Sequence, residues 1–479
     1  MHVLGLIAVA AFSQSSGSQL PFVSPIFSSH MVLQRDRTNT FWGWAAPGTR
    51  VTVTIAAHSG GGNADEHGKW TVRVSPPPTG GPYTVTIDGP QHVQLDDVLV
   101  GDVWVCSGQS NMEMGIANVN YAQAEIASAG YPGIRLYLLQ KNVAYIPAAT
   151  PAGSWATCSP QTVASGGWGG FSAAAYFFGR ELHRRLKVPI GLVDTCWGGT
   201  IAEAWTSKPG LASFPEFQPA IATVDTVGAE FAKSNTLPAG AATNPNVPTV
   251  LFNGMIAPIL PLAIKGAIWY QGESNASRAP QYRKLLPAMI EDWRRSFGQG
   301  DFPFFIVQLA NFSTRHPQPV EDAWADLREA QALTVKRVPN TGLAVAIDIG
   351  DGRDIHPKDK QSVGYRLALA ALHVAYGQEL PYCGPLYRSS KRDGNALRLR
   401  FDTSGYGLEA RGGKLAGFQI AGPDHKFAWA DAKIEGDEVV VSSASVPNPV
   451  SARYAWDTDP EATLYNSAGL PAVPFRTDK

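Results

Sequence analysis

The strongest constraint on the fold is a repeated pattern in the middle of the chain, in which a short apolar run, a polar or glycine-containing loop and a helical segment follow one another. The apolar runs cover residues 103–106, 189–194, 264–270, 302–308 and 343–347, and the helical segments cover residues 173–186, 281–297 and 323–337. Alternating strands and helices predict a parallel β-sheet with helices on both faces. Ligands bind at the carboxyl ends of the strands in such sheets, so the loops that follow the apolar runs are the candidate functional loops.

Strands of a different kind precede and follow this pattern. Residues 40–44, 51–55 and 83–87 alternate between apolar and polar side chains, with glycine-rich turns between them, and strands return after residue 381. A chain of 479 residues is also too long for one core. The sequence therefore predicts an N-terminal β-sandwich (19–100), a three-layer α/β/α domain (101–380) and a C-terminal β-rich domain (381–479).

Residues 1–18 are predicted to be a signal peptide, since the apolar run at 3–12 is too short to span a bilayer and small and polar residues follow it. We therefore expect a secreted or exported protein, whether extracellular, periplasmic or lysosomal. The 39 Lys and Arg residues nearly balance the 40 Asp and Glu residues. Such a chain has no global field to attract nucleic acid or an anionic membrane, and neither is an expected partner.

The four cysteines are too few and too scattered for a disulfide scaffold, although one disulfide is possible in an exporting compartment. The chain contains no CxxC or HExxH motif, so a structural zinc site or a zinc-protease site is not expected. No metal and no cofactor are predicted.

Three kinds of loop carry candidate chemistry. The GQSN sequence at 108–111 follows a buried strand and places Ser110 on a sharp strand-to-helix turn, where backbone N–H groups can converge on an oxyanion. The DIHP sequence at 354–357 places His356 among three carboxylates, where a neutral imidazole can accept a proton. The loops WGGT (197–200) and QGESN (271–275) can present further N–H groups at strand ends. Each loop alone has a bland alternative, respectively a helix N-cap, a solvated turn and a tight turn.

Together the loops resemble the SGNH hydrolase superfamily and, more closely, the sialate O-acetylesterase family. The resemblance extends over nearly the whole chain after the predicted signal peptide. The matching stretches are MVLQR (31–35), FWGW (41–44), GDVWVCSGQSNMEM (101–114), FSAAAYFFGREL (171–182), VPIGLVDTCWGGT (188–200), FNGMIAP (252–258), AIWYQGESNA (267–276), DIHPKDKQ (354–361), RYAW (453–456) and PFRT (474–477).

The resemblance implies an SGNH-like α/β/α catalytic domain and a role for each matching residue. Ser110 corresponds to the nucleophile and His356 to the general base. The N–H groups of Ser110 and Gly199 (or Gly198) line the implied oxyanion hole, with the Gln271 amide as a third donor. Glu273 is implied to be a network residue or a contact to a substrate hydroxyl, and Asn275 and Asn111 are implied substrate contacts.

Two departures from the superfamily pattern leave alternatives open. Arg353 occupies the position three residues before the histidine, where an aspartate is usual. His356 is therefore oriented by the Asp354 side chain, which we rank first, by the backbone carbonyl of residue 354, or by Asp351. The amide loop also reads QGE instead of the superfamily's GxND, so Asn275 is an alternative oxyanion donor to Gln271.

These roles predict a cofactor-independent serine esterase that removes O-acetyl groups from a sugar, through an acetyl-enzyme intermediate. The expected substrate is O-acetylated sialic acid, with acetylated xylan or another polysaccharide as the alternative. A non-catalytic carbohydrate-binding protein is a second alternative, against which the intact Ser110, Gln271 and His356 argue. The sequence gives no indication of the oligomeric state.

Overall fold

One long strand joins two of the predicted regions in the computed structural model, which describes residues 20–478. Strand β7 (His92–Gly108) is 17 residues long. Its first half pairs antiparallel with β6 (Gly80–Asp88) in the N-terminal region, and its second half pairs with β10 (Ile190–Cys196) and β11 (Gly266–Tyr270). The expected boundary between residues 100 and 101 therefore falls inside β7.

The central sheet has the strand order β13-β12-β11-β7-β10-β8-β9. All neighbouring strands pair in parallel except β9, which pairs antiparallel with β8. The remaining bounds are β8 (Tyr131–Leu138), β9 (Trp155–Cys158), β12 (Phe304–Val307) and β13 (Thr341–Ala344). The predicted mainly parallel sheet is confirmed, and its continuous apolar runs are those expected of strands buried on both faces.

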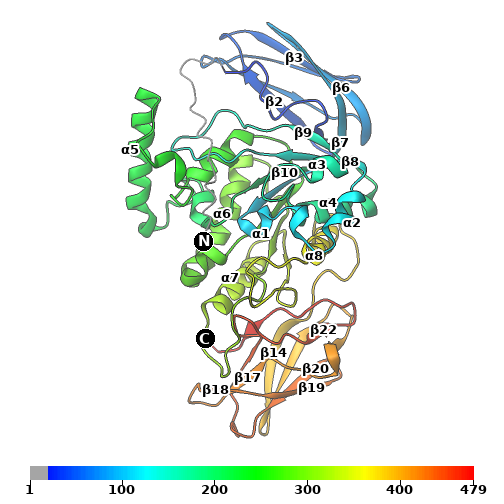
Figure 1. Cartoon of the computed structure of the whole chain (residues 1–479), viewed down its shortest axis with the longest axis vertical. Helices are drawn as coiled ribbons and strands as arrows, with labels where there is room; N and C mark the ends of the chain where they lie inside the picture. The colour runs from blue at the N-terminus through cyan, green and yellow to red at the C-terminus, as the bar shows by residue number, and fades with distance from the viewer. Residues whose placement is uncertain (1–19, 479) are drawn as a thin grey trace, which may run out of the picture.

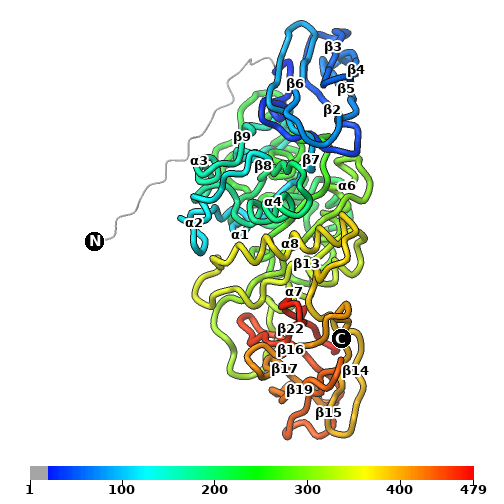
Figure 2. Tube along the Cα trace, turned by 90° about the vertical axis from the view of Figure 1, so that its right-hand side faces the viewer, coloured from blue at the N-terminus to red at the C-terminus, as the bar shows by residue number. Residues whose placement is uncertain are grey.

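The alternation of side chains along β7 fills two separate cores. Val103 and Val105 point into one core and Trp104 and Cys106 into the other, and all four are fully buried. Helices α6 (Ala279–Phe297) and α7 (Ala323–Arg337) supply the first core, while α4 (Ala173–Leu186) and α8 (Lys360–Val374) supply the second. The helices therefore cover both faces of the sheet, as Figures 1 and 2 show.

The two β-rich regions lie at opposite ends of this α/β layer (Figure 1). In the N-terminal region, β2 (Asn39–Trp44) pairs with β5 (Lys69–Val74), and β3 (Arg50–Ile55) pairs with β4 (His58–Asn63) and β6. Strand β1 (Val32–Gln34) pairs with β7.

The C-terminal region contains two four-stranded sheets whose facing side chains share a third core. One sheet comprises β14 (Leu386–Asp393), β15 (Ala396–Asp402), β20 (Glu438–Ser442) and β19 (Asp431–Glu435), and the other comprises β18 (Phe427–Trp429), β17 (Phe418–Ala421), β21 (Ser451–Tyr454) and β23 (Phe475–Arg476). A short pair, β16 (Leu408–Ala410) and β22 (Leu464–Asn466), completes the region.

Three sequence-based expectations concern processing and compartment. The predicted signal peptide lies outside the described residues. Across residues 20–478, no helix is long and apolar enough to cross a bilayer. All four cysteines are free thiols, and Cys106, Cys158 and Cys196 are buried. The structure therefore contains no disulfide of the kind that the sequence left open.

Candidate active site

The ends of three adjacent strands are level at the edge of the sheet where Ser110 lies. Both Cys196, at the end of β10, and Tyr270, at the end of β11, pair with Gly108 at the end of β7. The loops that begin at Ser110, Trp197 and Gln271 therefore leave the sheet side by side. This register brings together three of the loops that the sequence singled out.

Ser110 is the first residue of the short helix α1 (Ser110–Glu113), and it is partly exposed. The preceding turn requires glycine at position 108, where φ is +144° and a Cβ would lie 2.2 Å from the Tyr270 carbonyl oxygen. Gln109 then anchors the turn, because its N–H donates to the Tyr270 carbonyl at 3.0 Å. The sharp strand-to-helix turn that the sequence predicts for Ser110 is present.

The loop of His356 reaches the same edge and is joined to α1 by Asn111. The Asn111 Nδ2 donates to the carbonyl of Ile355 at 2.9 Å, so the residue after Ser110 holds the residue before His356. The His356 ring packs edge-on against Trp168, with centroids 4.9 Å apart. Among the hydrogen bonds of residues 20–478, none joins Ser110 Oγ to the His356 ring. Hydrogen bonds between catalytic groups often form or shorten only when substrate is bound.

The carboxylates in this loop differ in their relation to His356. Asp354 Oδ1 lies 3.6 Å from His356 Nδ1 and accepts the backbone N–H of His356 at 2.9 Å. Asp351 instead accepts the backbone N–H of Arg353 at 2.9 Å. Burial and the positive charge of Lys360 lower the pKa of His356, and Asp354 partly opposes this shift. Burial and Lys360 thus favour the neutral imidazole, the form that the predicted general base requires.

A buried polar network lies behind the predicted nucleophile and base, and sequence reasoning missed one member, Lys360. Asn111 donates to Glu273 Oε1 at 2.6 Å and accepts from Lys360 Nζ at 2.6 Å. Lys360 also donates to the Pro357 carbonyl at 2.9 Å. Burial lowers the pKa of Lys360 to about 7 and raises the pKa of Glu273. Asn111 therefore uses its side chain within the protein, and its role as a substrate contact stays a prediction.

The WGGT loop offers one clear candidate for an oxyanion donor. Gly198 N–H donates to Glu113 Oε2 at 2.5 Å, and Glu113 Oε1 bonds Lys141 Nζ at 2.6 Å. Gly199 is exposed, with φ at +74° and no atom within 4 Å of the position that a Cβ would take. Of the two glycines that the sequence left as alternatives, only Gly198 has its N–H engaged by a carboxylate.

The two amides in the QGESN loop are turned into the protein. Gln271 donates to the Thr200 carbonyl at 3.1 Å and to Asn275 Oδ1 at 2.7 Å, while Asn275 Nδ2 donates to Glu203 Oε2 at 3.0 Å. Both side chains are fully buried. These bonds tie neighbouring loops together. The oxyanion role of Gln271 or Asn275 and the substrate contact of Asn275 stay predictions. The sequence places both residues at a strand end but contains no signal for the direction of their side chains.

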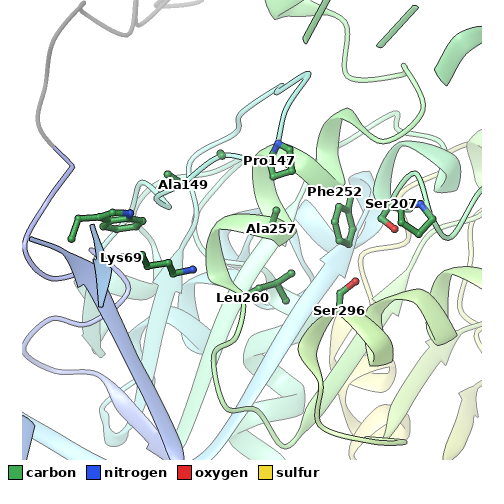
Figure 3. A pocket seen from close by; sticks show the side chains of 11 residues that line it. Lys69, Pro147, Ala149, Ser207, Phe252, Ala257, Leu260 and Ser296 are labelled. Atoms are coloured by element: carbon green, nitrogen blue, oxygen red, sulfur yellow. The ribbon is translucent and has the colours of Figure 1, made fainter. Parts of the chain in front are cut away.

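A separate cavity of about 550 Å³ opens between the N-terminal β region and the α/β layer (Figure 3). Its walls are mainly apolar, and it is lined by Trp44, Lys69, Pro147, Ala148, Ala149, Ser207, Pro209, Phe252, Ala257, Leu260 and Ser296. None of the predicted catalytic residues lines it.

The parallel sheet with its serine turn and histidine loop belongs to a carboxylic ester hydrolase that deacetylates carbohydrate. The chain is similar to the crystal structure of a carbohydrate acetylesterase from Xanthomonas citri, with a TM-score of 0.85 and 39% identity, over 95% of this chain and 99% of that one. The fold and the class of enzyme that the sequence predicted are thereby confirmed.

The family follows from comparison of sequences. The model of the carbohydrate esterase family of sialic acid-specific acetylesterases matches residues 100–236 and 245–373. The sialate O-acetylesterase of Mus musculus is 32% identical over 98% of this chain and 96% of its own length. That of Homo sapiens is 31% identical over 99% and 96%. The chain belongs to the sialic acid-specific acetylesterase family of carbohydrate esterases.

Proposed function

We propose that this enzyme hydrolyses O-acetyl esters of sialic acid with Ser110 as nucleophile and His356 as general base. The observation that carries the proposal is the hydrogen bond from Asn111 to the Ile355 carbonyl, which holds the two catalytic segments together at one edge of the sheet. Membership of a family named for sialic acid-specific acetylesterases supports the choice of substrate.

The proposed reaction has two steps. His356 takes the Ser110 proton as Oγ attacks the acetyl carbonyl carbon, and the tetrahedral oxyanion then collapses to an acetyl-enzyme. The sugar oxygen leaves with the proton from His356. Water, deprotonated by the same imidazole, next attacks the acetyl group, and Ser110 regains its proton as acetate leaves.

The backbone N–H groups of Ser110 and Gly199 are the proposed oxyanion donors. Each such donor contributes about 3 kcal/mol to the stability of the transition state. Gln271 and Asn275 act in this proposal by holding the loop that carries Gly199, since Gln271 donates to the carbonyl of the next residue, Thr200. Asn111, Glu273 and Lys360 act as positioning residues behind the nucleophile and the base.

The rim of the site has groups suited to an acidic sugar. Trp168 is 40% exposed beside His356 and offers a face on which a sugar ring can stack. Arg353, whose side chain is 93% exposed, lies three residues before His356. We assign Arg353 to the carboxylate of sialic acid, a group that acetylated xylan, the alternative substrate, does not present to it.

Ser110→Ala is the direct test of this proposal, with Ser274→Ala in the adjacent loop as the control. Acetate release should be measured side by side on O-acetylated sialic acid and on acetylated xylan. We expect the wild type to release acetate faster from O-acetylated sialic acid than from acetylated xylan. Ser110→Ala should lose nearly all activity and Ser274→Ala should not. A fluorophosphonate should label the wild type at Ser110. An active Ser110→Ala variant excludes Ser110 as the nucleophile. Faster release of acetate from acetylated xylan excludes O-acetylated sialic acid as the preferred substrate. No release from any ester indicates the alternative of a binding protein.

We also propose that the protein is exported. The support is the apolar run of residues 3–12, followed by small and polar residues, as in signal peptides. Expression of the full chain in a secreting host should yield mature protein outside the cytoplasm, and N-terminal sequencing locates the cleavage. Retention of an uncleaved chain in the cytoplasm contradicts this proposal.

A further inference from the structure

A cluster of one histidine and two aspartates lies where the loop before α7 meets the C-terminal β region. His316 and Asp322 belong to this loop, and Asp457 follows β21. Figure 1 shows α7 at the boundary between the two regions. The cluster is separate from the residues assigned to catalysis, and its members come from distant parts of the sequence.

The donor atoms of the cluster are spaced as metal ligands are. His316 Nδ1 lies 3.2 Å from Asp457 Oδ2 and 3.9 Å from Asp322 Oδ2. One donor atom from each residue lies within 4.8 Å of the others. Around a zinc ion with bonds of about 2.0–2.2 Å, neighbouring tetrahedral ligands are separated by about 3.3–3.6 Å. The two distances from His316 Nδ1, 3.2 and 3.9 Å, lie on either side of this range.

The two carboxylates are buried, and one oxygen is paired with the His316 ring alone. The side chains of Asp322 and Asp457 are 7% and 1% exposed. Asp322 Oδ1 accepts the N–H of Ala325 at 2.8 Å and so caps α7. Its Oδ2, which faces His316, accepts no hydrogen bond from any residue between 20 and 478. An oxygen that accepts no hydrogen bond keeps its lone pairs available to a cation beside the His316 ring.

The nearest buried cation does not neutralise these carboxylates directly. The Arg328 guanidinium is fully buried, but it donates to backbone carbonyls, including those of Asp457 at 2.6 Å and Thr458 at 2.9 Å. Asp459 adds a third carboxylate nearby, and its Oδ1 accepts from Asn311. Three carboxylates beside one arginine leave a surplus of negative charge that suits a divalent cation.

We propose that His316, Asp322 and Asp457 bind a divalent transition metal ion, with Zn²⁺ as the ion that best fits one imidazole and two carboxylates. Zinc accepts nitrogen and oxygen donors in a four-coordinate site, and water would complete the coordination. Calcium, which takes six to eight oxygen ligands, fits this set poorly. The site departs from the expectation, based on sequence motifs, that the chain has no metal.

Such an ion would fasten the C-terminal β region to the segment that supports the catalytic histidine. Asn311, in the same loop as His316, donates to Asp459 Oδ1 at 2.6 Å and accepts the N–H of Gly350 at 2.7 Å. Gly350 lies in the loop that continues to Asp354 and His356. The proposed role is therefore structural, and it is independent of whether Ser110 is the nucleophile.

Titration calorimetry with Zn²⁺ tests the site in the full chain after treatment with a chelator. We expect one ion per chain in the wild type and an affinity at least tenfold lower in His316→Ala and in Asp322→Asn. Asparagine also caps helices, so Asp322→Asn retains the start of α7. His58→Ala, which removes a half-buried histidine from β4, is the control and should bind as the wild type does.

Thermal unfolding separates loss of the site from loss of the fold. In the presence of chelator, His316→Ala should melt within about 2 °C of the wild type, because the His316 side chain is 41% exposed. Added Zn²⁺ should raise the Tm of the wild type and of His58→Ala but not that of His316→Ala. Absence of calorimetric binding, or equal binding by the wild type and both cluster variants, overturns the proposal.

Discussion

Replacing Asp354 by Asn isolates the charge of the carboxylate nearest to His356. The Asn oxygen can still accept the His356 N–H that Asp354 accepts at 2.9 Å, so the turn should be retained. The substitution removes a negative charge 3.6 Å from His356 Nδ1. Its effect therefore reports how far this carboxylate stabilises the imidazolium that forms in the transition state.

The expected loss is modest because the ion pair is open to water. At 3.6 Å, two unit charges interact by about 1.2 kcal/mol in water and about 4.6 kcal/mol at an effective dielectric constant of about 20. The Asp354 side chain is 46% exposed and that of His356 26% exposed, which favours the lower end. A loss of about 1–2 kcal/mol lowers kcat about 5- to 30-fold. A buried triad aspartate, by contrast, contributes about ten-thousandfold.

The assay is hydrolysis of p-nitrophenyl acetate across pH, with Asp351→Asn as the control in the same loop. Asp351 bonds Arg353 and not His356, so its variant should remain within about twofold of the wild type. The Asp354 charge raises the pKa of His356, and the substitution removes that charge. Asp354→Asn should therefore also move the acidic limb of kcat/KM to lower pH. A loss of kcat below about threefold, with the acidic limb unmoved, refutes the reasoning. The backbone carbonyl of residue 354 then remains as the group that orients His356. A loss above a thousandfold shows a tighter pair than the one described.

The remaining predictions concern the groups around the base and the amide loop. Burial and Lys360 lower the pKa of His356, so the wild-type kcat/KM should rise with pH through a midpoint below 6.5. Lys360→Met should move that midpoint upward. An unchanged or lower midpoint contradicts the role of the Lys360 charge. Gln271→Ala should lower the free energy of unfolding by about 2–4 kcal/mol in urea, because buried bonds to Thr200 and Asn275 are lost, with kcat reduced less than tenfold. A hundredfold loss of kcat at unchanged stability would instead make Gln271 an oxyanion donor.

The local pattern of the sequence determined the sheet and the position of Ser110. Continuous apolar runs such as residues 103–106, repeated between helical segments, suit strands buried on both faces, and the glycine at 108 permits the turn that presents Ser110. These are properties of neighbouring residues, so they can be read before any long-range contact is known. The matching motifs likewise indicated the esterase family, which the comparisons confirm.

Tertiary structure alone decided which polar groups meet. Gln271 and Asn275 stand at a strand end, yet the positions of Thr200 and Glu203 turn both amides inward. Lys360 joins the network of Asn111 only because α8 begins beside α1, and the cluster of His316 forms only where two distant segments cross. The direction of a side chain depends on partners far away in the chain, and periodicity and spacing contain no information about them.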